Sequence, residues 1–144
     1  MVSDVTKKAV YEALAGDDDL IALLGLDENG DPAIYDSFMN KLVDPPFPCI
    51  TFREGAGSAD GRVRNDTVDY ETFDVEIWAR DESALTIPQI HNEIDRLLHQ
   101  QTLLLETGEN LDCVRLSQNP DQYDPELKLH FGLYRYRLVV SRSE

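Results

Sequence analysis

The side chains best suited to chemistry in this sequence are three histidines, two cysteines and 28 carboxylates. His91 and His99 flank Asp95 at four-residue intervals, which on a helix places all three on one side. The span from His91 to His99 exceeds two helical turns, so one metal ion cannot reach both imidazoles. We therefore expect these three to be surface residues, His130 to lie on a strand face, and no metal to be bound.

Cys49 and Cys113 each stand in an apolar stretch that is typical of a strand, and no CxxC spacing occurs. Two distant cysteines do not form a disulfide framework or a zinc site. We expect both to be buried free thiols.

Sequence motifs of catalysis are also missing. There is no nucleophile elbow, zinc-protease helix, phosphate loop or dinucleotide fingerprint. The acidic run Asp17-Asp18-Asp19 stands at an expected helix start, where acids favour the positive helix end rather than a cation. The carboxylates are too abundant for any pair to be assigned as acid and base. The sequence predicts no enzyme and no cofactor, although a small cytoplasmic enzyme with a carboxylate-based site remains an alternative.

The net charge narrows the range of partners. The chain has 13 Lys+Arg against 28 Asp+Glu, giving −15 over 144 residues. Such a surface repels phosphate backbones and anionic lipid, so neither sequence-specific nucleic-acid binding nor membrane binding is expected. The charge serves solubility alone, or docking to basic surfaces; an acidic regulator that mimics DNA is a further possibility.

The hydrophobic periodicity predicts one α+β domain over residues 1–144, a mainly antiparallel curved sheet with helices packed on one face. Helices are expected at 3–15, after 17–19, and from 86, where Ile87, Ile90 and Ile94 form an apolar stripe with the histidines facing away. Strands are expected at 33–35, 49–54, 68–80, 110–117 and 127–141, with loops at 55–67 and 119–125.

The two longest strands are the most informative for function. Along 68–80, Phe73, Val75 and Ile77 alternate with charged residues, which predicts one buried and one solvated face. A change of phase near Thr72 predicts a bulge or a twist there, and another at Gly132 predicts a bulge. Strands of about 13 residues would span roughly 40 Å, more than a small core requires. Their excess could pair with a neighbouring subunit or lie against it.

Several arginines are candidates for such a contact. Arg62 and Arg64 fall in the 55–67 loop, and Arg135 and Arg137 lie near the C-terminus. They are either scattered surface arginines or interface anchors for an acidic neighbour, because arginine is favoured at contacts.

The order of these features resembles the tail completion, or tail terminator, proteins of long-tailed bacteriophages and prophages. The resemblance is carried by Leu20-Ile21-Ala22-Leu23-Leu24-Gly25, the strand entry Pro46 to Phe52, the strand end Val75-Glu76-Ile77-Trp78-Ala79-Arg80, and Leu97-Leu98-His99. It covers nearly the whole chain through short, mostly structural motifs.

The resemblance implies a structural virion protein of the tail or neck, assembled in the cytoplasm of the bacterial host. It implies a ring, expected to be a hexamer, that caps the head-proximal end of the tail tube, ends tube polymerisation and supports joining to the head. The implied partners are further copies of the chain, the tail tube protein and a head completion or connector protein, with DNA able to pass through the ring. The alternative is another head–tail connector. The assembly-interface hypothesis names Arg62, Arg64, Asp66, Gln122, Tyr123, Arg135 and Arg137.

Overall fold

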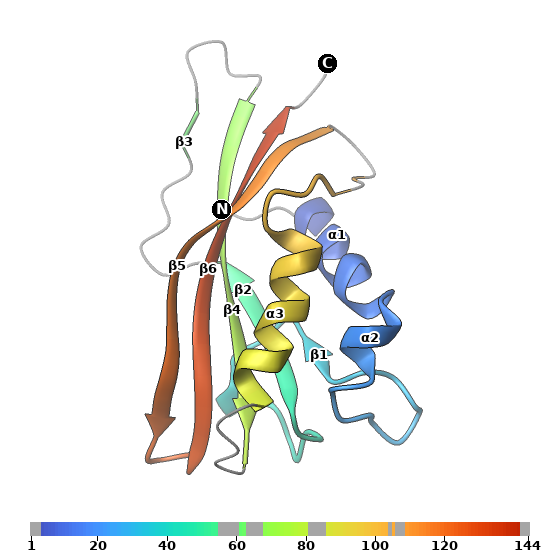
Figure 1. The fold of residues 1–144 in the computed structure, drawn as a ribbon, viewed down its shortest axis with the longest axis vertical. Coiled ribbons are helices and arrows are strands. Elements are labelled where there is room, and N and C mark those ends of the chain that lie inside the picture. The colour runs from blue at the N-terminus through green and yellow to red at the C-terminus, as the bar shows by residue number, and fades with distance from the viewer. Residues whose placement is uncertain are drawn as a thin grey trace.

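A computed structural model describes residues 4–54, 61–62, 68–80, 86–103, 105 and 109–141 (Figure 1). A six-stranded sheet forms one layer, and the helices form a second layer on one of its faces (Figure 1). The helices are α1 (Asp4–Ala15), α2 (Asp18–Ile21) and α3 (Thr86–Leu98), and a short 3-10 helix, η1, covers Met39–Lys41. The strands are β1 (Ile34–Tyr35), β2 (Cys49–Glu54), β3 (Gly61–Arg62), β4 (Val68–Ala79), β5 (Glu109–Asp124) and β6 (Leu129–Ser141).

The sheet is mainly antiparallel, which confirms the predicted fold class. Its order is β1-β2-β4-β6-β5, with β3 pairing to β4 beside this path. Only the β1–β2 pair is parallel among the strand pairs that the structure describes. The sheet therefore ends in the very short β1 on one side and the long β5 on the other.

The main core lies between the helices and the sheet. The apolar stripe predicted for the helix beginning at 86 is confirmed, since Ile87, Ile90, Ile94 and Leu98 of α3 are buried against the sheet. Side chains from β4 and β6 on the same face complete it, among them Phe73, Val75, Ile77, Tyr136, Leu138 and Val140. Among the described helices, none is long and apolar enough to cross a membrane.

The opposite face of the sheet carries a second, smaller core, and the prediction of a solvated face on β4 was wrong. Asp74, Glu76 and Trp78 are all buried. The segment around η1 and the β5–β6 turn cover this end of the face, and they bury Ala33, Met39, Cys49, Trp78 and Leu129 together. The carboxylates are accepted there because each has an arginine partner. The alternation of apolar and charged residues shows which side chains share a face of the strand. It does not show that a distant segment of the chain covers the charged face.

The two predicted bulges were also misplaced. β4 and β6 pair without a register shift from Val68↔Ser141 to Ala79↔His130, so neither Thr72 nor Gly132 is a bulge. At Gly132 the phase change has another cause: Leu129 before it packs in the second core, whereas Tyr134 after it packs in the main core. The register shifts occur instead in β5, at three places between Asn110 and Gln122.

The loop predicted at 119–125 is a strand for most of its length. β5 continues to Asp124, and Gln122, Tyr123 and Asp124 pair with Phe131, His130 and Leu129 of β6. Pro120 is tolerated because β5 is an edge strand, where a missing backbone N–H need not break the sheet. The chain reverses at 125–128, where Lys128 has a positive φ of 58°.

Candidate assembly surface

A polar network lies beneath α3, and it corrects the prediction that His91 is a surface residue. His91 is only 8% exposed, and its ring stacks on Tyr134 with centroids 3.7 Å apart. Burial, the dominant cause, lowers the pKa of His91 to about 4, and nearby Arg115 lowers it further while Asp95 opposes the shift. The imidazole is therefore neutral at pH 7 and serves as a packing group between helix and sheet.

Asp95 is the centre of this network, because one of its oxygens accepts a hydrogen bond from β6 and the other accepts one from β5. It accepts the Tyr136 hydroxyl at 2.8 Å and the Arg115 guanidinium at 2.6 Å. His99 Nδ1 accepts the backbone N–H of Arg115 at 3.0 Å, and the N–H of Gln100 donates to the Cys113 carbonyl. The end of α3 thus occupies the outer edge of β5 at residues 113–115. Another strand cannot add there.

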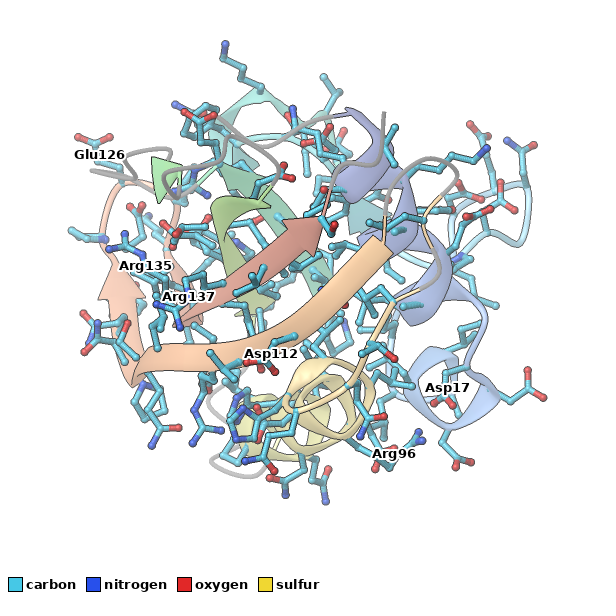
Figure 2. All side chains as sticks on the ribbon, turned by 90° about the horizontal axis from the view of Figure 1, so that it is seen from above. Asp17, Arg96, Asp112, Glu126, Arg135 and Arg137 are labelled. Atoms are coloured by element: carbon cyan, nitrogen blue, oxygen red, sulfur yellow. The ribbon has the colours of Figure 1, made fainter. Side chains whose placement is uncertain are left out.

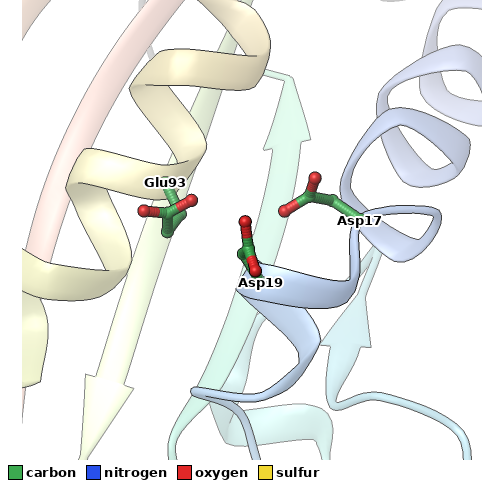
Figure 3. A group of neighbouring side chains, drawn as sticks. All are labelled: Asp17, Asp19 and Glu93. Carbon is green, nitrogen blue, oxygen red and sulfur yellow. The ribbon is translucent and has the colours of Figure 1, made fainter.

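An acidic corner joins α2 to α3, and it fits the expectation that these acids serve a helix start. Asp17, Asp19 and Glu93 converge from the two helices (Figure 3). Asp17 caps α2 by accepting from the Leu20 N–H and also accepts from Arg96 at 2.7 Å. Arg96 also donates to Glu93. The hydrogen bond from Arg96 to Asp17 is the main cause that lowers the pKa of Asp17. The group is thereby an arginine-bridged contact between helices.

Two of the proposed arginine anchors, Arg135 and Arg137, lie on the face of the sheet opposite the helices. Arg135 donates to Asp74 through two nitrogens, at 2.8 and 3.3 Å. Arg53 pairs with Glu76 on the same face. Figure 2 shows Arg135 and Arg137 together on β6, on the other side of the molecule from the Asp17–Arg96 contact. Arg135 is therefore paired within its own chain, while its side chain remains partly exposed to solvent.

The remaining predicted residues fall into two groups at opposite ends of the sheet. Gln122 and Tyr123 are exposed on β5, close to the turn that leads to β6, and the Tyr123 ring lies 4.9 Å from that of His130. Arg62 lies in β3, which pairs through its backbone with the far end of β4, so that Arg62 stands opposite Asp69 in the strand register (Figure 1). Arg64 and Asp66 lie outside the described residues. The five of these residues that the structure describes therefore do not form one cluster.

The half of β5 that approaches the turn is an open surface. Every side chain described between Leu116 and Tyr123 is exposed, and these two apolar residues are 46% and 52% exposed. The sequence from 116 to 123 contains one charged residue, whereas 17 to 31 contains six acids and no base. A long, nearly uncharged exposed strand is unusual on a chain with a net charge of −15.

Exposed apolar residues in the segment between α2 and β2 were missed by the sequence reading. Leu26, Phe38 and Val43 are exposed, and Val43 is 89% exposed. Alternation and helical periodicity carry no signal for them, because they lie in irregular chain. The one local signal was Asp44-Pro45-Pro46, because two successive prolines cannot continue a helix.

The polar groups beneath α3 join the helices to the sheet, and the exposed apolar residues suit contacts with other proteins. The chain belongs to the tail completion protein gp17 family, whose model matches residues 8–141. It is accordingly a tail-related structural protein of a phage-like virion. This confirms the resemblance read from the sequence motifs.

A solved structure supports the fold independently. The chain superposes on a protein chain from the "Virion of native gene transfer agent (GTA) particle" with a TM-score of 0.76. The alignment covers 97% of each chain at 18% sequence identity. At that identity the likeness concerns the fold. No match was found among curated protein sequences.

Proposed function

We propose that this protein is a tail terminator, which forms a ring at the head-proximal end of the tail tube, stops tube polymerisation and supports joining to the head. Membership of the tail completion family supports the place in the virion. The contact between copies is the finer part of the proposal, and we assign one side of it to the exposed half of β5, from Leu116 to Tyr123.

The observation that carries this assignment is the low charge of an exposed strand on a strongly acidic chain. Copies with a net charge of −15 repel one another, so their contact is most favourable where charges are sparse. Leu116 and Tyr123 supply apolar area there, and Ser117, Gln118 and Asn119 supply hydrogen-bonding groups. Tyrosine is enriched and charged residues are depleted at the centres of interfaces.

The structure of β5 limits how another copy can contact this strand. α3 occupies the edge at 113–115, and the register shifts and Pro120 interrupt regular pairing below it. These are the features by which natural edges avoid uncontrolled strand addition. The contact is therefore made by side chains of β5, packed against a different surface of the next copy, as a closed ring requires.

The test is a particle experiment with a matched surface control. The gene is deleted from its phage or prophage and complemented with the natural chain, with Leu116→Lys/Tyr123→Lys, or with Tyr11→Lys, which alters an exposed aromatic on α1. Tails of irregular or excessive length, unattached to heads, are expected for the deletion and the β5 variant but not for the α1 variant. Light scattering measures the oligomeric state of each purified chain.

Two other outcomes would change the conclusion. Tails of normal length that fail to join heads would make the protein a head–tail connector. Normal virions from the β5 variant, with an unchanged oligomeric state, would remove β5 from the contact.

A further inference from the structure

A groove lies at the β1 edge of the sheet, at the opposite end of the strand order from β5. Its volume is about 490 Å³, and it is bounded by the turn at 26–28 and by the segment at 42–46, with Tyr35 of β1 between them. We call it the β1-edge groove. Leu26 and Val43 present apolar side chains on its two sides, and both are exposed.

The two sides of the groove are held firmly by backbone contacts. The Gly25 N–H donates to the Pro48 carbonyl at 2.9 Å, and the Ala33 N–H donates to the Gly25 carbonyl at 3.0 Å. A Cβ on Gly25 would lie 2.9 Å from the Phe47 carbonyl oxygen, so the two segments approach as closely as glycine allows. Preformed walls lower the ordering cost of binding.

The turn and the neighbouring segment are also fixed locally. Asp27 accepts hydrogen bonds from the N–H groups of Asn29 and Asp31, at 2.8 and 2.9 Å. Asp44 has a positive φ of 44°, a conformation that costs energy for a non-glycine residue. It sits directly after Val43, which is consequently held out from the surface at 89% exposure.

The charges of the groove have one sign. Asp27, Glu28 and Asp44 line it, and no lysine or arginine is among its described lining residues. Lys41, the nearest base in the sequence, points instead toward the Phe38 ring, at 5.8 Å from its centroid. The groove therefore combines exposed apolar area with an uncompensated negative field.

A second copy of this chain is a poor occupant for such a site. Four of the arginines that the structure describes are already paired with carboxylates of their own chain. Arg80 lies over the Phe47 ring at 4.7 Å. A second copy would also bring a further charge of −15 to an acidic groove.

We propose that the β1-edge groove docks a segment of a different protein in which an apolar side chain is flanked by lysines or arginines. The apolar side chain packs between Leu26 and Val43, and the bases face Glu28 and Asp44. Basic flanks raise the association rate and exclude acidic segments, while the apolar anchor supplies most of the affinity. The site is separate from the proposed β5 contact, so either can fail without the other.

The test uses short capped peptides as probes. A fluorescein-labelled pentapeptide with leucine between two pairs of lysines is titrated with the full chain and followed by fluorescence polarisation. Replacing the leucine with serine should weaken binding at least about tenfold, because the apolar contact with Leu26 and Val43 is lost. Replacing the four lysines with glutamates should abolish binding.

Variants locate the site. Glu28→Lys/Val43→Ser should weaken binding of the leucine peptide at least about tenfold, from lost apolar contact and reversed charge. Glu12→Lys, which changes an exposed acid on α1, should leave it within about twofold. Leu116→Lys/Tyr123→Lys should also leave it unchanged, whatever that variant does to the oligomeric state.

Three results would overturn the proposal. The peptide could fail to saturate at any accessible concentration. The leucine and serine peptides could bind equally, which would reduce the effect to charge. The Glu12→Lys chain could lose as much binding as the groove variant, which would make the attraction a property of the whole acidic surface.

Discussion

The hydroxyl of Tyr136 on β6 donates to Oδ1 of Asp95 on α3 at 2.8 Å, and this buried contact joins the sheet to the helix layer. Tyr134, two residues earlier on the same face, is equally buried, but its hydroxyl has no hydrogen-bond partner within the described part of the chain. The two tyrosines thus form a natural pair in which one hydroxyl is used and the other is not.

Removing the two hydroxyls should therefore have different consequences. Tyr136→Phe leaves one Asp95 oxygen without its donor and should lower the free energy of unfolding by about 1–2 kcal/mol. Tyr134→Phe removes an unpartnered polar atom and should be neutral or stabilising. Urea denaturation measures both, with equal m-values expected. Equal losses for the two variants would show that the Tyr136–Asp95 contact does not stabilise the fold.

The buried His91 predicts a specific dependence of stability on pH. Its folded pKa is about 4, below the ordinary value of 6.5, so the unfolded chain takes up a proton that the folded chain refuses between those values. Stability is therefore lost as pH falls from 6.5 to 4, by roughly 3 to 4 kcal/mol at about 1.4 kcal/mol per pKa unit. The groups facing His91 are Asp95 on α3, Arg115 on β5, and Tyr134 and Tyr136 on β6.

His91→Phe is the matched variant, because it keeps an aromatic ring against Tyr134 and cannot titrate. Between pH 7 and pH 4 the natural chain should lose more stability than this variant, measured by urea midpoints at each pH. The carboxylates titrate in both chains and cancel in the difference. Parallel pH profiles would contradict the assignment to His91.

How far the sequence could predict this fold depends on whether a segment's structure is local in origin. α3 and β2 were placed to within a residue, because their caps, periodicity and flanking prolines act on nearby chain. β5 was cut short at 117, because Asn, Pro and Asp indicate a loop unless a partner strand is present. β6 supplies that partner from a distant part of the sequence.

The candidate site shows the same limit more strongly. Arg135 could be identified as an arginine on a strand, but its pairing with Asp74 depends on the register of two strands 61 residues apart in sequence. His91 was predicted on the polar side of its helix because histidine is a polar residue. In the structure its ring packs against Tyr134 of β6 and is buried. Contacts of this kind need the tertiary structure.

Gly132 is the next position at which a small change should have a large effect. A Cβ there would lie 2.8 Å from the Tyr134 ring and 2.9 Å from the Ile87 side chain. Tyr134 cannot move away easily, since His91 stacks on its ring. Gly132→Ala should destabilise the protein by about 1–3 kcal/mol through overpacking. Thermal or urea unfolding measures it, with Ser117→Ala as an exposed strand control; no loss would show that α3 yields freely.

Both cysteines should be inert in the folded protein. Burial raises the pKa of the Cys49 and Cys113 thiols to about 12, so almost no reactive thiolate exists at pH 8. A thiol reagent such as iodoacetamide should label neither residue in the native chain and both in denaturant, as mass spectrometry would show. Rapid labelling of native protein at one cysteine would indicate local opening at that strand.

The proposed contact through β5 predicts how self-association responds to salt. Each copy carries −15, and at about 0.01 M ionic strength the screening length of roughly 30 Å lets whole subunits repel one another. At about 0.15 M it falls to roughly 8 Å, while the apolar and hydrogen-bonding contacts of a nearly uncharged strand are hardly affected. Association should therefore strengthen as sodium chloride is raised, which sedimentation velocity can follow. An interface built on Arg62, Arg135 and Arg137 against acids of the next copy would weaken instead, so the sign of the salt dependence separates the two surfaces.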